Sequence, residues 1–273
     1  WLFDYMRKNK IQGITEAFSG GADSSYNSAK VRVMVELACR ELGVDGCMKV
    51  MGHLTYKDKV LEAYHQQGEA AAVKTIMDNM LTCVYMGTDN SSEETLRAAR
   101  TLVEGGTDAE GKSFEGIGGK FYYRNVQRLV EVYAEIFSGV NPAALDDARE
   151  AEVRREIAAI LKTRPEATTP EALAQRVEQL KKSFEEVSHT VLSVAQEEHQ
   201  ISYENIQARL RQVLIMLFSN VENKLAVANP NLDEGRNSYA TWGGDLHGGM
   251  ISGNAHKNKQ RQLEHMRLLH DHG

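Results

Sequence analysis

The residues with the clearest chemical potential form a glycine-rich loop at Ser19–Ser25. The loop follows an apolar stretch at 11–18 that is typical of a buried strand, and it precedes a helical pattern at 25–42. Gly20 and Gly21 allow positive φ and a close approach of the backbone to a ligand. The N–H groups at a helix N-terminus attract an anion, and the serine hydroxyls of the loop add donors. The spacing therefore predicts a phosphate-binding turn.

Asp23 lies inside this loop, where its negative charge would repel a phosphate. The repulsion is removed if Asp23 binds Mg²⁺ that bridges the phosphates. The loop lacks the lysine of a P-loop and the third glycine of a dinucleotide fingerprint. An ordinary strand-to-helix turn is the alternative interpretation. The order Gly-Gly-Ala-Asp-Ser directly after an apolar strand favours nucleotide binding with magnesium.

Apolar stretches typical of strands alternate with helical patterns along the chain. The expected strands are 11–18, 81–86, 120–125 and 225–228, and the expected helices include 1–9, 25–42, 126–137, 203–218 and 258–270. This alternation predicts an α/β fold with a doubly wound parallel sheet. The segment 141–200 is rich in Ala, Glu, Arg, Lys and Gln, which predicts a charged helical insertion. The insertion divides one core domain into a first part, 1–140, and a second part, 201–273.

Two later segments add candidate binding residues. Asn205 and Arg209 are four residues apart on an expected helix and share one face. An amide and a guanidinium in that arrangement suit a carboxylate, a phosphate or a ribose. Glu234 follows the last expected strand, at the edge of the sheet where α/β folds bind ligands.

Ser-Gly-Gly-x-Asp-Ser resembles the signature of the ATP pyrophosphatases, which have a Rossmann-like adenine nucleotide alpha hydrolase fold. The helix Asn205-Ile206-Gln207-Ala208-Arg209-Leu210-Arg211 and the turn Asn231-Leu232-Asp233-Glu234-Gly235 look like those of the NAD synthetase family. The segments 1–5 and 90–95 are most similar to the corresponding segments of the glutamine-dependent NAD synthetases. One departure is Trp242, since the family commonly has a lysine after the threonine that Thr241 matches.

The resemblance implies roles for individual residues. The implied ATP-binding residues are Ser19, Gly20, Gly21, Asp23, Ser24, Ser25, Tyr85, Ser92 and Thr241. The implied residues for deamido-NAD are Asn205, Arg209, Asp245 and His256. Asp23 and Glu234 are the implied magnesium ligands, and together with Lys257 they form the implied catalytic group.

The resemblance also implies a reaction. ATP and Mg²⁺ adenylylate deamido-NAD, and ammonia then displaces AMP to give NAD⁺. In the glutamine-dependent type the ammonia comes from glutamine, through a nitrilase-like glutaminase domain that lies upstream. This sequence begins at Trp1 inside a helical pattern, so we expect a piece of a longer polypeptide without that glutaminase. The family is further expected to form a homodimer or a higher homo-oligomer.

The composition of the chain bears on its class, its possible partners and the state of its cysteines. The chain has 273 residues, a net charge of -6, 42% hydrophobic and 26% charged residues, which is ordinary for a globular protein. We expect no nucleic-acid partner and no membrane span, because the charge is acidic and no apolar run reaches ~20 residues. The three cysteines match no zinc spacing and are interpreted as buried, reduced thiols of a cytoplasmic protein.

Two other functions stay open from the residues. The first is another ATP pyrophosphatase, such as GMP synthetase or a tRNA-thiolating enzyme. The second is a non-catalytic module that keeps the nucleotide loop without turnover.

Overall fold

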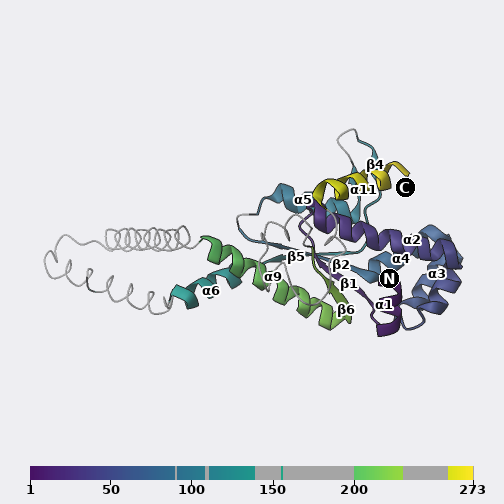
Figure 1. The fold of residues 1–273 in the computed structure, drawn as a ribbon, viewed down its shortest axis with the longest axis horizontal. Coiled ribbons are helices and arrows are strands. Elements are labelled where there is room, and N and C mark those ends of the chain that lie inside the picture. Colours follow the sequence, from purple (N-terminus) through teal and green to yellow (C-terminus); the bar gives the residue numbers. More distant parts are fainter. Residues whose placement is uncertain (90, 108–110, 139–154, 156–199, 230–257, 273) are drawn as a thin grey trace, which may run out of the picture. The chain divides into compact units, whose positions relative to one another are not determined.

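The computed structural model describes residues 1–89, 91–107, 111–138, 155, 200–229 and 258–272 (Figure 1). The chain divides into two compact units, one of Trp1–Gln127 with Ala208–Gly273 and one of Arg128–Gln207. The second unit includes α6 (Gln127–Ser138) from Arg128 onward and the first residues of α9 (Gln200–Glu222). The insertion predicted at 141–200 lies outside the described residues, apart from Arg155 and Gln200. The first unit contains every strand that the structure describes.

A four-stranded sheet in the order β5-β2-β1-β6 forms the centre of this unit. Its strands are β1 (Gly13–Ala17), β2 (Leu81–Gly87), β5 (Lys120–Asn125) and β6 (Lys224–Val227). Every pairing is parallel, with Ile14 opposite both Leu81 and Leu225. The chain moves outward from β1 to β2 and β5, then returns to place β6 on the other side of β1. The strand order therefore reverses between β1 and β6, where α/β folds bind ligands.

Alternate residues of β2 enter two different cores, as expected for a strand covered on both faces. Leu81, Cys83 and Tyr85 join the larger core, which also receives buried side chains of α2 and α4. Val84 and Met86 join a smaller core that includes Ile215 of α9. All seven residues of β2 are buried, which explains why its sequence is mostly apolar, with Thr82 as the polar exception. The doubly wound α/β prediction is confirmed by this arrangement.

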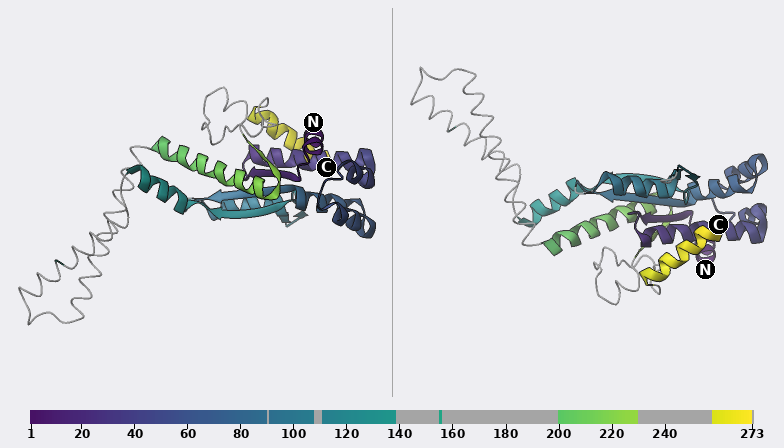
Figure 2. Two further views of the ribbon diagram at one scale, coloured as in Figure 1. Left: turned by 90° about the horizontal axis from the view of Figure 1, so that it is seen from below. Right: turned by 90° about the horizontal axis from the view of Figure 1, so that it is seen from above.

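Helices cover the larger core. They are α1 (Leu2–Asn9), α2 (Ala22–Val50), α3 (Lys57–Gln67), α4 (Glu69–Met80) and α5 (Glu93–Glu104). The first turn of α5 is capped by Ser92, whose side chain accepts from the Thr95 N–H. The last helix, α11 (Lys259–His272), runs beside α2 in both views of Figure 2, and Tyr26 Oη lies 2.8 Å from His265 Nδ1 between them.

The structure differs from the expected elements in two places. Helix α2 begins at Ala22 rather than at residue 25, and it continues past a kink at Gly43, where φ is 68°. A short hairpin, β3 (Gly106–Thr107) with β4 (Ser113–Phe114), was not predicted, because two-residue strands carry no periodicity. The three cysteines are buried and free, as predicted.

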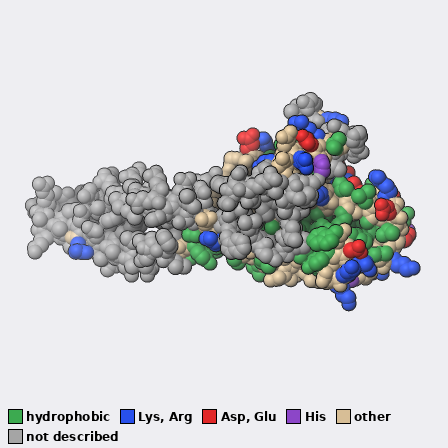
Figure 3. All heavy atoms as spheres, viewed as in Figure 1, with side chains coloured by type: hydrophobic (Ala, Val, Ile, Leu, Met, Phe, Trp, Pro, Cys, Tyr) green, Lys and Arg blue, Asp and Glu red, His purple; other side chains and the backbone are tan. Residues whose placement is uncertain are grey.

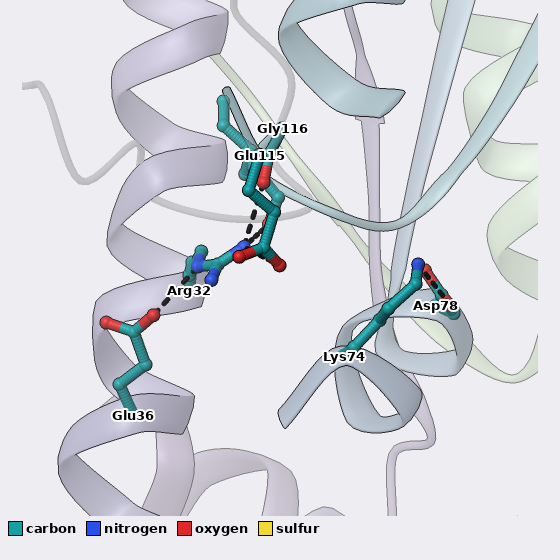
Figure 4. Close-up of polar contacts among 7 residues, drawn as sticks. Arg32, Glu36, Lys74, Asp78, Glu115 and Gly116 are labelled. Carbon is teal, nitrogen blue, oxygen red and sulfur yellow. Dashed lines mark hydrogen bonds and ion pairs between the residues drawn. The ribbon is translucent and has the colours of Figure 1, made fainter. Parts of the chain in front are cut away.

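Arg32 ties the segment after this hairpin to α2. Its guanidinium pairs with Glu36 at 2.7 Å and with Glu115 at 3.1 Å, and it donates to the Gly116 carbonyl at 2.8 Å (Figure 4). The Arg32 side chain is 23% exposed but that of Glu115 is 67% exposed, so the bond to the Gly116 carbonyl is better shielded from water than the ion pair with Glu115. Figure 4 also shows Lys74 and Asp78, an exposed pair on one face of α4.

On the face seen in Figure 3, basic and acidic side chains of the described residues are interspersed around apolar ones. Among the helices that the structure describes, none is long and apolar enough to cross a bilayer.

Candidate nucleotide site

A cavity of about 520 Å³ opens at the carboxyl ends of the central strands. Residues from β1, β2, β6, α2, α9 and α11 line it together. The polar lining side chains include Ser19, Asp23, Ser24, Tyr85, Ser91, Arg211, Gln212, Asn229 and Lys259. Its position at the reversal of strand order is where this class of sheet binds ligands. Its volume is in the range of pockets that hold cofactors and drug-sized ligands, about 300–1,000 Å³.

Five residues of the predicted Ser19–Ser25 loop line the cavity, namely Ser19, Gly21, Ala22, Asp23 and Ser24, whereas Gly20 and Ser25 are not among the lining residues. Gly20 has φ 76°, and a Cβ there would lie 3.0 Å from Ala99 on α5. Gly21 caps α2 at its N-terminus. The Gly21 N–H donates to Ser19 Oγ at 3.2 Å, and Ser24 Oγ donates to the Gly21 carbonyl at 3.1 Å. These bonds hold the loop in shape, and the partial positive charge of the helix end faces an incoming anion.

Asp23 lies in the first turn of α2 and lines the cavity, with 15% of its side chain exposed. Lys259, the first residue of α11, brings its Nζ to 3.6 Å from Asp23 Oδ2. The loop thus presents a carboxylate and an ammonium side by side in one cavity. Sequence reasoning missed Lys259, although its place beside Lys257 at the start of an expected helix was a usable signal.

The arrangement fits a magnesium ion bound largely through a nucleotide. Mg²⁺ is usually held by one or two carboxylates plus phosphate oxygens and waters. Asp23 offers one such carboxylate, which is only partly exposed and already beside a cationic group. Within the part of the chain that the structure describes, no group of three or more His, Cys, Asp or Glu side chains gathers. A site made by protein ligands alone is therefore not indicated among these residues.

Helix α9 forms the opposite wall through one of its faces. Ala208, Arg211, Gln212 and Ile215 line the cavity, spaced as residues of one helical face are. Arg209 is exposed and lies off this face, and half-buried Asn205 belongs to the second unit. The structure therefore brings Arg211 and Gln212 to the cavity, while the roles of Asn205 and Arg209 stay predictions.

Tyr85 and Ser91 line the cavity at the carboxyl end of β2. Tyr85 is buried, and its hydroxyl lies 3.0 Å from Thr95 Oγ1. Ser92, the predicted ligand, caps α5 and is not among the lining residues, whereas its neighbour Ser91 is. The Thr88 N–H donates to Ser91 Oγ at 3.0 Å, which folds the segment after β2 toward the cavity.

Asn229 closes the β6 end, where its Nδ2 donates to the Ala17 carbonyl at 2.7 Å. The remaining predicted site residues lie outside the described residues. They are Glu234, Thr241, Asp245, His256 and Lys257.

Comparison with known proteins gives consistent results. The sequence model of the NAD synthase family matches residues 157–267. The glutamine-dependent NAD(+) synthetase of Oryza sativa subsp. indica is 33% identical over 105 residues, or 38% of this chain and 14% of that protein. Its counterpart in Arabidopsis thaliana is 31% identical over 104 residues, again 38% of this chain and 14% of the relative.

A solved structure extends the likeness to nearly the whole chain. The crystal structure of a glutamine-dependent NAD(+) synthetase from Cytophaga hutchinsonii superimposes with a TM-score of 0.67 and 26% identity, covering 99% of this chain. The matched region is 36% of the Cytophaga hutchinsonii protein, so the present chain spans about a third of the length of that relative. The fold is thus that of the adenine nucleotide alpha hydrolases.

Proposed function

We propose that this chain is a member of the NAD synthase family, whose sequence model matches residues 157–267, and that it forms the ATP-dependent synthetase site of an NAD⁺ synthetase. The observation that carries the proposal is the cavity in which a glycine loop, the N-terminus of α2, Asp23 and Lys259 converge. A helix end and an ammonium suit the phosphates of ATP, and Asp23 suits the magnesium that accompanies them.

The proposed reaction has two steps. A carboxylate oxygen of the nicotinate in deamido-NAD attacks the α-phosphorus of ATP, and the bond to the β-phosphate oxygen breaks. Pyrophosphate leaves, and the carboxylate becomes a mixed anhydride. The nitrogen of ammonia then bonds to the carbonyl carbon, AMP leaves with the anhydride oxygen, and the nitrogen loses a proton. NAD⁺, AMP and pyrophosphate result.

The chain's own residues supply binding and charge for these steps. The α2 N–H groups and the hydroxyls of Ser19, Ser24 and Ser25 receive the β- and γ-phosphates, and Lys259 leaves Asp23 for the same oxygens. Magnesium, when bound, neutralises the charge that builds on the departing pyrophosphate. Asp23 would hold this ion, with Glu234 as the second proposed ligand.

The remaining contacts follow the walls of the cavity. Tyr85 and Ser91 lie where we propose that adenosine binds, and Ser92 and Thr241 are further proposed ATP contacts. Arg211 and Gln212 face the α-phosphate or the nicotinate carboxylate from α9, since a guanidinium suits either anion. Further proposed contacts to deamido-NAD are Asn205, Arg209, Asp245 and His256, and Lys257 is proposed as a second phosphate-binding cation.

The whole-protein context is likewise proposed. Relatives named as glutamine-dependent suggest that ammonia derives from glutamine through a glutaminase domain outside these residues. We propose a cytoplasmic enzyme that assembles as a homodimer or higher homo-oligomer.

The test measures pyrophosphate release by the full chain with ATP, deamido-NAD and ammonium chloride. We expect release that depends on both deamido-NAD and Mg²⁺, with glutamine unable to replace ammonium. Release with xanthosine monophosphate in place of deamido-NAD would favour a GMP synthetase, and ATP binding without release would favour a non-catalytic module.

Asp23→Asn is the informative variant, because it keeps the shape of the side chain and removes its charge. We expect it to abolish pyrophosphate release without lowering the melting temperature. Glu62→Gln, a surface substitution on α3, is the matched control and should leave release unchanged. Normal turnover by Asp23→Asn contradicts the proposed metal-binding role.

A further inference from the structure

A lysine lies against the carboxylate that is proposed to bind magnesium. Lys259 Nζ is 3.6 Å from Asp23 Oδ2, and both residues line the cavity. An ammonium at this distance occupies part of the space that a divalent cation on Asp23 would need, and it repels that cation. The Lys259 side chain is 57% exposed, so it can turn away from Asp23 when another anion competes for it.

Lys259 stands at a position that a helix does not favour for a cation. It is the first residue of α11, and the N-terminus of a helix carries a partial positive charge. The adjacent Asn258 caps this end, since its Oδ1 accepts from the Arg261 N–H at 3.0 Å. The lysine is therefore kept where the charge of its own helix disfavours it, and the nearby carboxylate of Asp23 gives a reason for that placement.

A second contact between the same two helices fixes the position of this lysine. Tyr26 lies one turn after Asp23 on α2, and its hydroxyl is 2.8 Å from His265 Nδ1 on α11. The helices that these residues join lie side by side in both views of Figure 2. The two contacts together hold α11 on α2 in a register that brings Lys259 to Asp23.

The charges around the cavity favour an anion over a free metal ion. Among the described residues that line it, Asp23 is the one carboxylate, whereas Arg211 and Lys259 are cations. The N-termini of α2 and α11 add partial positive charge, because Asp23 is in the first turn of α2 and Lys259 begins α11. A polyphosphate is attracted by this combination, and a divalent cation on its own is repelled.

We propose that Lys259 keeps divalent cations off Asp23 until a nucleotide binds, so that magnesium enters the cavity together with ATP. The inference deepens the proposed function and rests on it for the identity of the nucleotide. When ATP arrives, its phosphate oxygens take the Lys259 ammonium, and the Asp23 carboxylate becomes available to the metal. Lys259 thus makes metal binding conditional on nucleotide binding.

The experiment titrates Mn²⁺ into the full chain without nucleotide and follows the electron paramagnetic resonance signal of the free ion. Mn²⁺ is suited by the same oxygen ligands as Mg²⁺. We expect Lys259→Met to bind Mn²⁺ about tenfold more tightly than the native chain, because the variant lacks the repelling ammonium. Lys259→Arg keeps the positive charge and should bind Mn²⁺ as weakly as the native chain.

Two further variants locate the gained binding. Adding Asp23→Asn to Lys259→Met should abolish the gain, since the carboxylate is then absent. Lys74→Met is the matched control, because Lys74 Nζ lies 3.1 Å from Asp78 Oδ2 on α4 and its loss changes the net charge equally. This control should leave Mn²⁺ binding at the native level.

ATP affinity, measured by calorimetry in EDTA, should change in the opposite direction. Without metal, Lys259 is one of the cations that receive the phosphates, so Lys259→Met should weaken ATP binding about tenfold. A general loss of structure would weaken the binding of both ligands. Tighter Mn²⁺ binding together with weaker ATP binding therefore identifies the proposed role.

Each outcome is decisive. Equal Mn²⁺ affinity in the native chain and Lys259→Met, or no detectable binding in either, overturns the proposal. A gain that also appears in Lys259→Arg or Lys74→Met, that survives Asp23→Asn, or that leaves ATP affinity unchanged overturns it as well. If ATP binds to neither chain, the proposed function fails, while the Mn²⁺ titration still decides whether Lys259 excludes metal from Asp23. A gain confined to Lys259→Met and dependent on Asp23, with weaker ATP binding, supports the proposal.

Discussion

Two glutamates near the central sheet show how differently the same side chain behaves in two regions of one fold. Glu16, in β1, is fully buried, and burial raises its pKa to about 8. For Glu222, at the end of α9, burial also raises the pKa, but hydrogen bonds from Lys224 and Thr82 outweigh it and leave the pKa below its usual value.

The difference lies in the partners. Lys224 Nζ lies 2.7 Å from Glu222 Oε2, Thr82 Oγ1 donates to the same oxygen at 2.7 Å, and the Lys224 side chain is only 3% exposed. Among the described residues, Glu16 has one hydroxyl donor and no cation at bonding distance. A partly buried carboxylate with a cation stays charged, and a buried carboxyl without one becomes a neutral acid.

The largest expected effect comes from Glu16→Gln. The folded pKa of about 8 exceeds the ordinary value of 4.5. Native stability is therefore full below pH 4.5, falls between pH 4.5 and 8, and is level above. The slope is about 1.4 kcal/mol per pH unit, so the variant should be more stable by about 3–5 kcal/mol at pH 8. Urea unfolding from pH 4 to 9 measures this, and parallel stability curves for both chains would contradict it.

Lys224→Met tests the other region. Removing the cation leaves the partly buried Glu222 unpaired, and breaking such a pair costs about 3–5 kcal/mol when it is deeply buried. Because Glu222 is 20% exposed, we expect about 2 kcal/mol, reduced by solvent screening. Urea unfolding at pH 7 measures the loss. The loss should shrink as pH falls through the lowered pKa of Glu222, and a loss that is constant with pH would refute the pairing as its cause.

Ser28→Ala should have a smaller effect on the Glu16 region. It removes the hydroxyl that bonds Glu16 Oε2, so the ionised form loses this donor and the pKa rises further. We expect a loss of about 1–2 kcal/mol at pH 7. Carboxyl titration by ¹³C NMR follows the pKa directly. An unchanged or lower pKa in the variant would show that Ser28 does not favour the carboxylate.

The smallest effect is expected from an exposed ion pair that resembles the Glu222 pair in chemistry alone. Lys74 Nζ and Asp78 Oδ2 are 3.1 Å apart, but their side chains are 64% and 42% exposed (Figure 4). Lys74→Ala should change stability by less than about 0.5 kcal/mol. A loss comparable to that of Lys224→Met would mean that burial is not what distinguishes these pairs.

The sheet and its glycine loop could be predicted because their signals are local. A strand, two glycines and a helix are adjacent in the chain, and the mostly apolar sequence of β2 indicates its burial. The opposite pKa shifts of Glu16 and Glu222 could not be predicted from such local signals. Glu16 is surrounded in sequence by small and apolar residues that are typical of a strand, and tertiary packing decides which of the described residues bond to its carboxyl.

The sequence indicated the helix at 203–218 as part of the site, but it could not tell which face of that helix lines the cavity. Asn205 and Arg209 stay predicted contacts, and the residues of α9 that line the cavity include Arg211 and Gln212. The rotation of a helix about its axis is set by its packing on the sheet, here through Ile215 in the smaller core. Sequence spacing fixes which residues share a face, and only packing decides which face meets the ligand.

The contact between Gly20 and Ala99 has a consequence for how the phosphate loop can be tuned. Ala99 is fully buried on α5, and the loop backbone rests directly on it. Position 99 therefore sets the clearance of the loop. A bulkier side chain at position 99 would clash with the loop backbone at Gly20 and displace the loop toward the cavity. It would not change any group that lines the cavity. If the cavity binds ATP as proposed, the side-chain volume at position 99 would therefore change the affinity for ATP without any change of charge.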